Sequence, residues 1–209
     1  VNAFVGPVVA DYLDHLAGKL EEADFRGSLL IMQSNGGVVS SGVVRKTPAV
    51  TVLSGPAAAP AAGIFYSSLL EYKNCITVDM GGTSFDAAVV SDGRCVTGTE
   101  GSISRYRVAL PSLDIITIGA GGGSIGWIDT GGLLRMGPQS AGALPGPACY
   151  GRGGKEPACT DADLVLGYLN PDFFAGGKLR LDKTAAEESI RRLASPLGLS
   201  VRDAAAGMF

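Results

Sequence analysis

The sequence of 209 residues has no apolar run of the roughly 18–20 residues that a membrane-spanning helix requires. It has no basic cluster, and its net charge of −3 disfavours binding to nucleic acid or to an anionic membrane surface. Its first residues, VNAFVGPVVADYLDHLAGKL, lack the basic start and the cleavage site of a signal peptide. We therefore expect a cytoplasmic protein that binds neither nucleic acid nor membrane. Because it begins without methionine and ends inside a predicted helix, we also expect a fragment of a longer polypeptide.

Histidine and metal-binding cysteine patterns are scarce as well. The single histidine, His15, cannot by itself supply the usual ligand set of a zinc site. None of the four cysteines forms a CxxC pair, and they are too few for a disulfide scaffold. Cys149, within PGPACYG, is open to two interpretations, a nucleophile or a structural thiol. The lack of a histidine nearby in the sequence favours the structural thiol.

Glycine is abundant instead, with 31 of 209 residues, about twice its usual share of ~7%. The groups of strands with helices between them indicate an α/β fold with a mixed sheet. Glycine-rich and proline-rich turns separate the predicted elements. The apolar pattern predicts helices at 7–23, after the turn at 54–56, and at 160–169, 182–195 and 200–209; strands at 29–32, 50–53, 75–79, 85–90 and 115–118, with the sheet continuing through 94–110; and a loop over 135–158.

The strongest local signal is VDMGGTSFD at 78–86, in which two strands flank a glycine turn. The two glycines lack a Cβ, so backbone N–H groups can converge on an anion there. Thr83 and Ser84 can donate hydroxyl hydrogen bonds to the same oxygens. Asp79, at the end of a predicted buried strand, is placed to hold a hydrated magnesium ion. The same residue types also fit an ordinary glycine hairpin whose aspartates cap the turn.

This segment resembles the phosphate-binding hairpin of the actin, sugar kinase and Hsp70 ATPase superfamily, whose pattern is D-x-G-G-T/G-x-x-D. With five further motifs it resembles one branch of that superfamily, the hydantoinase A / 5-oxoprolinase family. That family includes ATP-dependent N-methylhydantoinase subunits, 5-oxoprolinase, and subunits of acetone- and acetophenone-type carboxylases. The motifs cover nearly the whole chain in order: MQSNGG at 32–37, LSGPAAAPAAG at 53–63, VDMGGTSFD at 78–86, IGAGGGSI at 118–125, GPACYGRGG at 146–154 and TDADLVLGYL at 160–169.

The resemblance implies an actin/Hsp70-like (ribonuclease H-like) α/β ATPase domain with flanking helices, of which this chain is a part. Residues 1–209 would belong to a hydantoinase A-type ATPase domain, with the phosphate hairpin at 78–90 and the glycine loop at 118–126, and without an N-terminal partner domain and a C-terminal remainder. The implied cofactors are ATP and Mg²⁺ or another divalent cation. The implied site residues are Asp79, Thr83 and Asp86 as catalytic groups, Asp79 also as the metal ligand, and Gly81, Gly82, Ser84, Gly121, Gly122, Gly123, Asn35, Gly36 and Gly37 as nucleotide-binding residues.

Two departures from the family pattern stand out. Such ATPases use two phosphate loops, and the first would lie in a preceding domain that is not within these residues. The family's SGPAGG also reads SGPAAAP here, which weakens the expectation of close ligand approach at that loop. Other motifs keep ordinary alternatives. IGAGGGSI also fits a strand-to-strand turn, Asp161 and Asp163 also fit the start of a helix, and Arg105, Arg107 and Arg152 fit solvated surface residues as well as anion contacts.

The implied activity of the parent protein is ATP-dependent opening of a cyclic amide, such as a hydantoin or a 5-oxoproline-like ring, after phosphoryl activation of the amide oxygen. A second possibility is a subunit of an ATP-dependent acetone- or acetophenone-type carboxylase. A third is that this chain is a non-catalytic nucleotide-binding part, because one phosphate loop is absent. The expected partners are a small-molecule cyclic amide and a second catalytic subunit of the hydantoinase B type.

Overall fold

The computed structural model describes residues 1–99, 101–103 and 106–209. Arg105, one of the arginines considered as anion contacts, lies outside the described residues. The chain divides into two compact units. The first comprises Val1–Asp79 and Asp86–Ile116, and the second comprises Met80–Phe85 and Thr117–Phe209.

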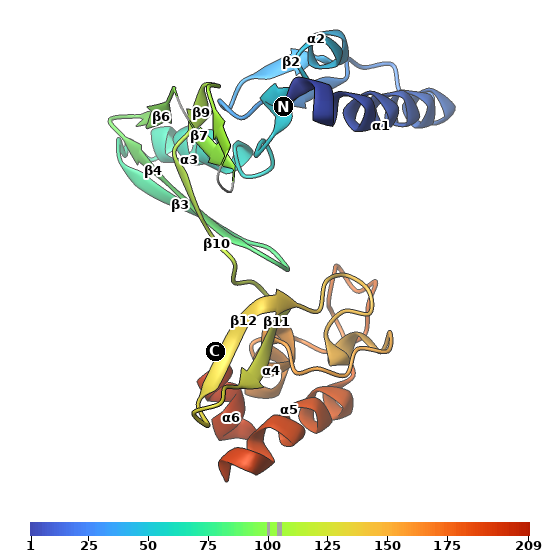
Figure 1. The fold of residues 1–209 in the computed structure, drawn as a ribbon, viewed down its shortest axis with the longest axis vertical. Helices are drawn as coiled ribbons and strands as arrows, with labels where there is room; N and C mark the ends of the chain where they lie inside the picture. The colour runs from blue at the N-terminus through green and yellow to red at the C-terminus, as the bar shows by residue number, and fades with distance from the viewer. Residues whose placement is uncertain (100, 104–105) are drawn as a thin grey trace. The chain divides into compact units, whose positions relative to one another are not determined.

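Within its described residues up to 118 the chain combines α-helices with short strands, which Figure 1 colours from blue to green. Most of these strands pair in small antiparallel sheets, such as β1 with β2 and β7 with β8. The elements in this part are α1 (Asn2–Glu22), β1 (Leu30–Met32), β2 (Val38–Ser40), α2 (Ser41–Lys46), the 3₁₀ helix η1 (Pro48–Thr51), α3 (Ala58–Leu69), β3 (Cys75–Met80), β4 (Phe85–Ser91), β5 (Arg94–Cys95), β6 (Thr97–Gly98), β7 (Gly101–Ile103), β8 (Tyr106–Val108), β9 (Ser112–Leu113) and β10 (Ile115–Ile118).

The first helix is longer than its apolar spacing predicts, because it begins at Asn2 instead of residue 7. The Asn2 side chain accepts a hydrogen bond from the backbone N–H of Ala49 over 2.8 Å, which ties the first turn to η1. Pro7, the first residue of the helix predicted at 7–23, therefore lies in the second turn of α1. Leu13 is the fully buried residue of the helix, and it anchors α1 to the rest of the unit.

The strand predicted at 50–53 is wrong, because this segment forms η1 and a turn. The Ser34 hydroxyl lies 2.8 Å from the carbonyl oxygen of Val50 and 2.5 Å from that of Val52. These contacts, with Pro48 at the start of η1, hold the segment in a turn, so the β-branched residues here do not form a strand.

A sheet in the order β10-β4-β3 carries the predicted hairpin, and β5 extends it by pairing with β4. Helix α3 lies very close to β3, since a Cβ added at Gly63 would stand 2.3 Å from Cγ2 of Thr77. The strands predicted at 29–32, 75–79, 85–90 and 115–118 are confirmed. Small side chains in 57–63 thus let α3 approach β3 closely.

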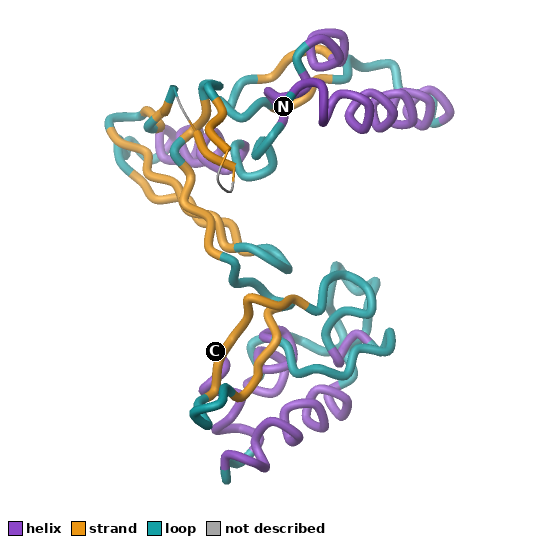
Figure 2. The backbone as a smooth tube through the Cα atoms, viewed as in Figure 1, coloured by secondary structure: helices purple, strands orange, loops and turns teal. Residues whose placement is uncertain are grey.

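The second unit packs a β-hairpin against three helices, which Figure 2 shows beside the two strands. Ile190, Leu193 and Met208 form its core with four alanines, and Ile128, Leu134 and Met136 of the hairpin pack against them. Burying such side chains supplies the main favourable energy of the unit. The elements are β11 (Ser124–Ile128), β12 (Leu134–Ser140), the 3₁₀ helix η2 (Ala148–Tyr150), α4 (Cys159–Leu166), α5 (Lys183–Leu197) and α6 (Val201–Met208).

The loop predicted over 135–158 is only partly correct. Its first residues belong to β12, which pairs antiparallel with β11 in the register Trp127↔Arg135. Pairing with a neighbouring strand outweighs the glycine and proline content of this segment. Helix α4 also begins earlier than predicted, at Cys159 with Ala158 as N-cap, and ends before Gly167, which takes the left-handed conformation. Helix α5, predicted over 182–195, has Asp182 as its N-cap, and the Asp182 side chain accepts the N–H of Ala185.

The structure confirms the α/β fold class with flanking helices. Among the described residues, no helix combines the length and the apolar character needed to cross a membrane.

Candidate phosphate hairpin and its glycine loop

The turn between β3 and β4 is a tight hairpin that belongs to the second unit. The N–H of Gly81 donates to the carbonyl oxygen of Ser84 over 2.9 Å and closes the turn. Gly81, Gly82 and Thr83 are exposed, and Ser84 is half-buried. Of the two flanking aspartates, Asp79 is exposed near the end of β3, and Asp86 is half-buried in β4.

The glycine loop between β10 and β11 holds this turn through its backbone. The N–H of Gly122 donates to the carbonyl oxygen of Gly81 over 3.0 Å, and the N–H of Gly123 donates to that of Gly82 over 2.7 Å. The Ser140 hydroxyl adds a weaker bond to the Gly82 oxygen at 3.4 Å. The two glycine motifs, about 40 residues apart in the sequence, thus meet through consecutive backbone hydrogen bonds.

Close packing explains why the loop contains glycines at these positions. A Cβ at Gly121 would stand 2.6 Å from the Gly81 oxygen and 2.8 Å from the Thr83 nitrogen. A Cβ at Gly123 would stand 2.7 Å from the Gly82 oxygen. These distances are shorter than van der Waals contact, so side chains at these positions would push the turn away. The N–H groups of Gly122 and Gly123 are both used in hydrogen bonds to the hairpin. The face of the turn at Gly82 is open, because nothing lies within 4 Å of a Cβ added there.

The start of helix α4 supports the glycine loop from behind. Both the backbone N–H and the hydroxyl of Thr160 donate to the carbonyl oxygen of Gly122, at 2.8 and 2.7 Å. The next residue, Asp161, is fully buried, and its carboxylate accepts the N–H groups of Ala148, Cys149 and Ala158 at 3.2, 2.7 and 2.9 Å. These bonds pair the buried charge and fix η2 against α4. Asp161 is therefore a structural group at the helix start, in its first turn.

The two buried cysteines, Cys149 in η2 and Cys159 at the start of α4, are unsuited to nucleophilic chemistry. Burial, with the nearby Asp161 charge as a smaller cause, raises the pKa of the fully buried Cys149 thiol far above its usual value. Burial, reinforced by the Asp163 carboxylate, raises the pKa of Cys159 to about 11. Burial also raises the pKa of Asp163. Because the thiolate is the reactive form, these environments favour the structural interpretation of Cys149.

The third glycine motif, at 32–37, forms a turn of the first unit. The Asn35 side chain accepts the N–H of Gly37 over 2.9 Å, and Gly36 takes a positive φ of 81°. A Cβ at Gly36 would stand 3.1 Å from Cδ1 of Leu113, so this turn packs on β9. The Ser34 carbonyl oxygen accepts the Leu113 N–H at 2.9 Å, which fixes the same contact.

The structure thus brings the predicted residues of the hairpin turn together with Gly121, Gly122 and Gly123. The turn of Asn35 belongs to the other unit. Residue-type reasoning missed Ser140 and Thr160, which bond the two glycine segments. For Thr160 the sequence held one signal, its place as the first residue of TDADLVLGYL and of the helix predicted at 160–169.

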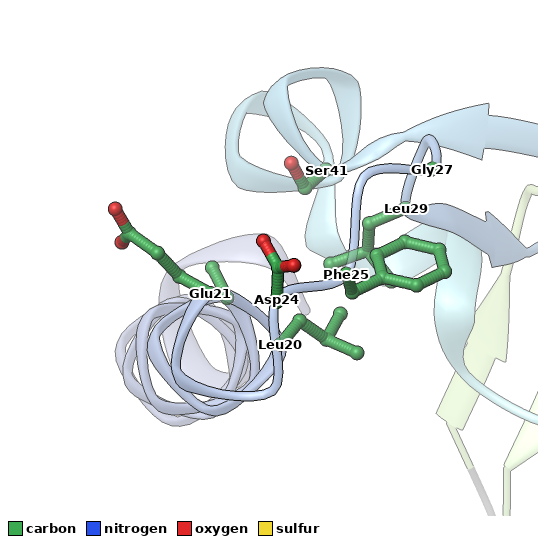
Figure 3. A pocket seen from close by; sticks show the side chains of 8 residues that line it. Leu20, Glu21, Asp24, Phe25, Gly27, Leu29 and Ser41 are labelled. Atoms are coloured by element: carbon green, nitrogen blue, oxygen red, sulfur yellow. The ribbon is translucent and has the colours of Figure 1, made fainter.

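The pocket shown in Figure 3 does not add a catalytic cluster. It lies in the first unit, around the end of α1, and its charged groups are Glu21 and Asp24. The Asp24 carboxylate pairs with Arg26 at 3.2 Å, and both side chains are exposed. Across the described part of the chain, no group of three histidine, cysteine or acidic side chains could hold a metal ion alone. The residues that line this pocket are Ala17, Leu20, Glu21, Asp24, Phe25, Gly27, Leu29 and Ser41.

Comparison with known protein families decides the family of this chain. The family model described as "Hydantoinase/oxoprolinase" matches residues 1–209, which is the whole chain. The chain belongs to the hydantoinase/oxoprolinase family. The family resemblance of the six motifs is therefore confirmed.

Individual relatives of this chain include a caprolactamase subunit and subunits of acetone and acetophenone carboxylases. The chain is 44% identical to the caprolactamase subunit alpha of Pseudomonas jessenii over 209 residues, which cover 100% of this chain and 30% of that protein. A crystal structure of the ATP-dependent caprolactamase from P. jessenii matches with a TM-score of 0.76 and 44% identity, over 98% of this chain and 30% of that one.

The structure also resembles nucleotide-free acetone carboxylase, an enzyme of ATP-dependent acetone carboxylation, with a TM-score of 0.86 and 34% identity. This match covers 93% of the chain and 28% of acetone carboxylase. The chain thus spans less than a third of the length of these family members.

Proposed function

We propose that the full-length protein is an ATP-dependent amidohydrolase that opens a cyclic amide, such as a hydantoin or 5-oxoproline-like ring. In this proposal the hairpin of Asp79–Asp86 binds the phosphates of ATP. Transfer of the terminal phosphoryl group to the amide oxygen turns a poor electrophile into a good one. Water then adds to the carbonyl carbon, the ring C–N bond breaks with the nitrogen taking a proton, and a second water hydrolyses the resulting acyl phosphate to a carboxylate and phosphate.

The observation that carries this proposal is the open face of the turn at Gly82. The turn is fixed from behind by the Gly122 and Gly123 amides, and nothing lies within 4 Å of a Cβ at Gly82. Fixed backbone groups beside open space allow a phosphate to approach without reorganisation of the protein. Membership of a family with ATP-dependent relatives supports the same ligand.

The donor groups at this turn fit a magnesium–nucleotide complex. Magnesium prefers a carboxylate with water and phosphate oxygens, and Asp79 offers an exposed carboxylate directly before the turn. Thr83 offers an exposed hydroxyl for the phosphate oxygens. When bound, the cation supplies neutralisation of the negative charge that develops during phosphoryl transfer. Asp86 and Ser84 complete the proposed set.

A second catalytic subunit is part of the proposal, because the relative in P. jessenii is described as subunit alpha. Residues that recognise the ring would then lie outside this chain. A subunit of an ATP-dependent ketone carboxylase is the second candidate function. Its support is the structural match to acetone carboxylase, with a TM-score of 0.86 and 34% identity, beside 44% identity to the caprolactamase.

Titration calorimetry of Mg·ATP into the full-length protein tests nucleotide binding. The Gly82→Val variant should lose saturable binding and keep its melting temperature, since the side chain enters open space. The control variant Gly119→Ala, also with nothing within 4 Å of the added Cβ, should keep both. Equal loss of binding and thermal stability in Gly82→Val would instead identify an ordinary structural turn.

Turnover assays of the protein with its partner subunit separate the two chemistries. Opening of a hydantoin, 5-oxoproline or lactam ring with ATP and without bicarbonate supports the hydrolase. A strict requirement for bicarbonate overturns the hydrolase in favour of the carboxylase.

A further inference from the structure

We propose that Thr160 is a positioning residue for the phosphate hairpin, acting through two peptide groups. The proposal rests on the proposed nucleotide-binding function of that hairpin. Thr160 is 6% exposed, in the first turn of α4. It lies 77 residues beyond Thr83 in the sequence, so its role is visible only in the fold.

The first step is the fixed carbonyl group of Gly122. Its oxygen accepts both the backbone N–H and the hydroxyl of Thr160, at 2.8 and 2.7 Å. A Cβ at Gly122 would stand 2.8 Å from the Thr160 hydroxyl oxygen, which shows how closely the two residues pack. The buried Asp161 carboxylate holds the start of α4 in turn, so the donor pair itself is fixed.

The second step is the peptide plane that joins Gly122 to Gly123. In a trans peptide the C=O and the N–H point in opposite directions and cannot turn independently. Thr160 holds the C=O, and the N–H of the same plane donates to the Gly82 oxygen at 2.7 Å. Two donors on the carbonyl also polarise the peptide and strengthen its N–H as a donor.

The peptide between Gly82 and Thr83 in the hairpin is held by its C=O in the same way. The C=O of Gly82 belongs to the peptide whose N–H is that of Thr83, and this peptide is trans. Because Gly123 holds the C=O, the Thr83 N–H points away from the Gly123 amide. The Thr83 nitrogen itself lies beside Gly121, where an added Cβ would stand 2.8 Å from it. Thr83 is exposed. The Thr160 hydroxyl thus orients a backbone donor of the proposed phosphate site through two rigid planes.

The test compares Thr160→Val, which removes the hydroxyl at nearly constant volume, with Thr160→Ser, which keeps it. Thr184→Val is the matched control, because Thr184 holds the same position in the first turn of α5 and is exposed. Two quantities are measured on the full-length protein: the hydrogen-exchange rate of the Gly123 amide and the affinity for Mg·ATP. If Thr160→Val fails to fold, Thr160→Ala takes its place as the variant that lacks the hydroxyl.

Removing one net hydrogen bond should speed Gly123 exchange and weaken Mg·ATP binding by about five- to tenfold each in Thr160→Val. Thr160→Ser and Thr184→Val should stay near wild type in both. The positioning role would be overturned if Thr160→Val left both the Gly123 exchange rate and the Mg·ATP affinity unchanged. It would also be overturned if Thr160→Ser lost as much Mg·ATP affinity as Thr160→Val. Either result would leave the proposed nucleotide-binding function standing. Wild-type protein that binds no Mg·ATP would overturn the proposed function and with it the role toward nucleotide.

Discussion

The backbone N–H of Gly123 donates to the carbonyl oxygen of Gly82 over 2.7 Å, and this bond joins two glycine motifs that are separate in the sequence. A Cβ on Gly123 would stand 2.7 Å from the same oxygen, closer than van der Waals contact allows. The glycines of the loop therefore serve backbone contact with the hairpin, and the glycine of the hairpin faces open space. A side chain added at Gly123 should therefore lower stability, whereas one added at Gly82 should affect ligand binding.

Gly123→Ala should destabilise the protein by about 1–3 kcal/mol, the usual cost of overpacking a close contact. The added Cβ would stand 2.7 Å from both the Gly82 oxygen and the Ser140 hydroxyl oxygen. Urea denaturation measures the free energy of unfolding. Gly119→Ala in the same loop should have a much smaller effect, and equal losses in the two variants would contradict the packing argument.

Asp161→Asn should cost about 3 kcal/mol, because a neutral amide replaces a buried carboxylate that accepts three backbone N–H groups. The amide nitrogen would also face donors. Asp163→Asn is the control two residues away. Burial raises the pKa of the Asp163 carboxyl, so at neutral pH its charge is unfavourable and the neutral amide should leave stability unchanged or raise it. Thermal unfolding of both variants at pH 7 checks the contrast.

The sequence was sufficient for the hairpin, the glycine loop and the family, because each rests on a local pattern of strand, glycine and hydroxyl residues. It was insufficient for elements decided by distant contacts. The segment 50–53 has the composition of a strand, yet the Ser34 hydroxyl and Pro48 hold it in a turn. Likewise, the role of Thr160 depends on the placement of α4 behind the loop, which no local motif encodes.

Gly63→Ala tests the close approach of α3 to β3. The new Cβ would stand 2.3 Å from Cγ2 of Thr77 and 3.3 Å from the Cys75 sulfur, so we expect a loss of about 1–3 kcal/mol. Gly18→Ala, in the exposed part of α1 with nothing within 4 Å, should instead gain about 0.5–1 kcal/mol from helix propensity. A second change, Thr77→Ser, removes the clashing methyl and should restore part of the loss in Gly63→Ala. Failure of that rescue would place the strain elsewhere.

The buried thiol of Cys159 should make the stability of the protein depend on pH in the alkaline range. Burial, and then the Asp163 charge, raises the pKa of Cys159 from 9.0 to about 11 in the folded protein. The unfolded chain therefore releases the thiol proton first, and the folded state holds more protons between these values. Stability contributed by the neutral thiol is complete below about pH 9 and should fall as pH rises toward 11. Urea denaturation between pH 8 and 11 should show a shallower decline in Cys159→Ala than in wild type, and parallel curves would contradict the assignment.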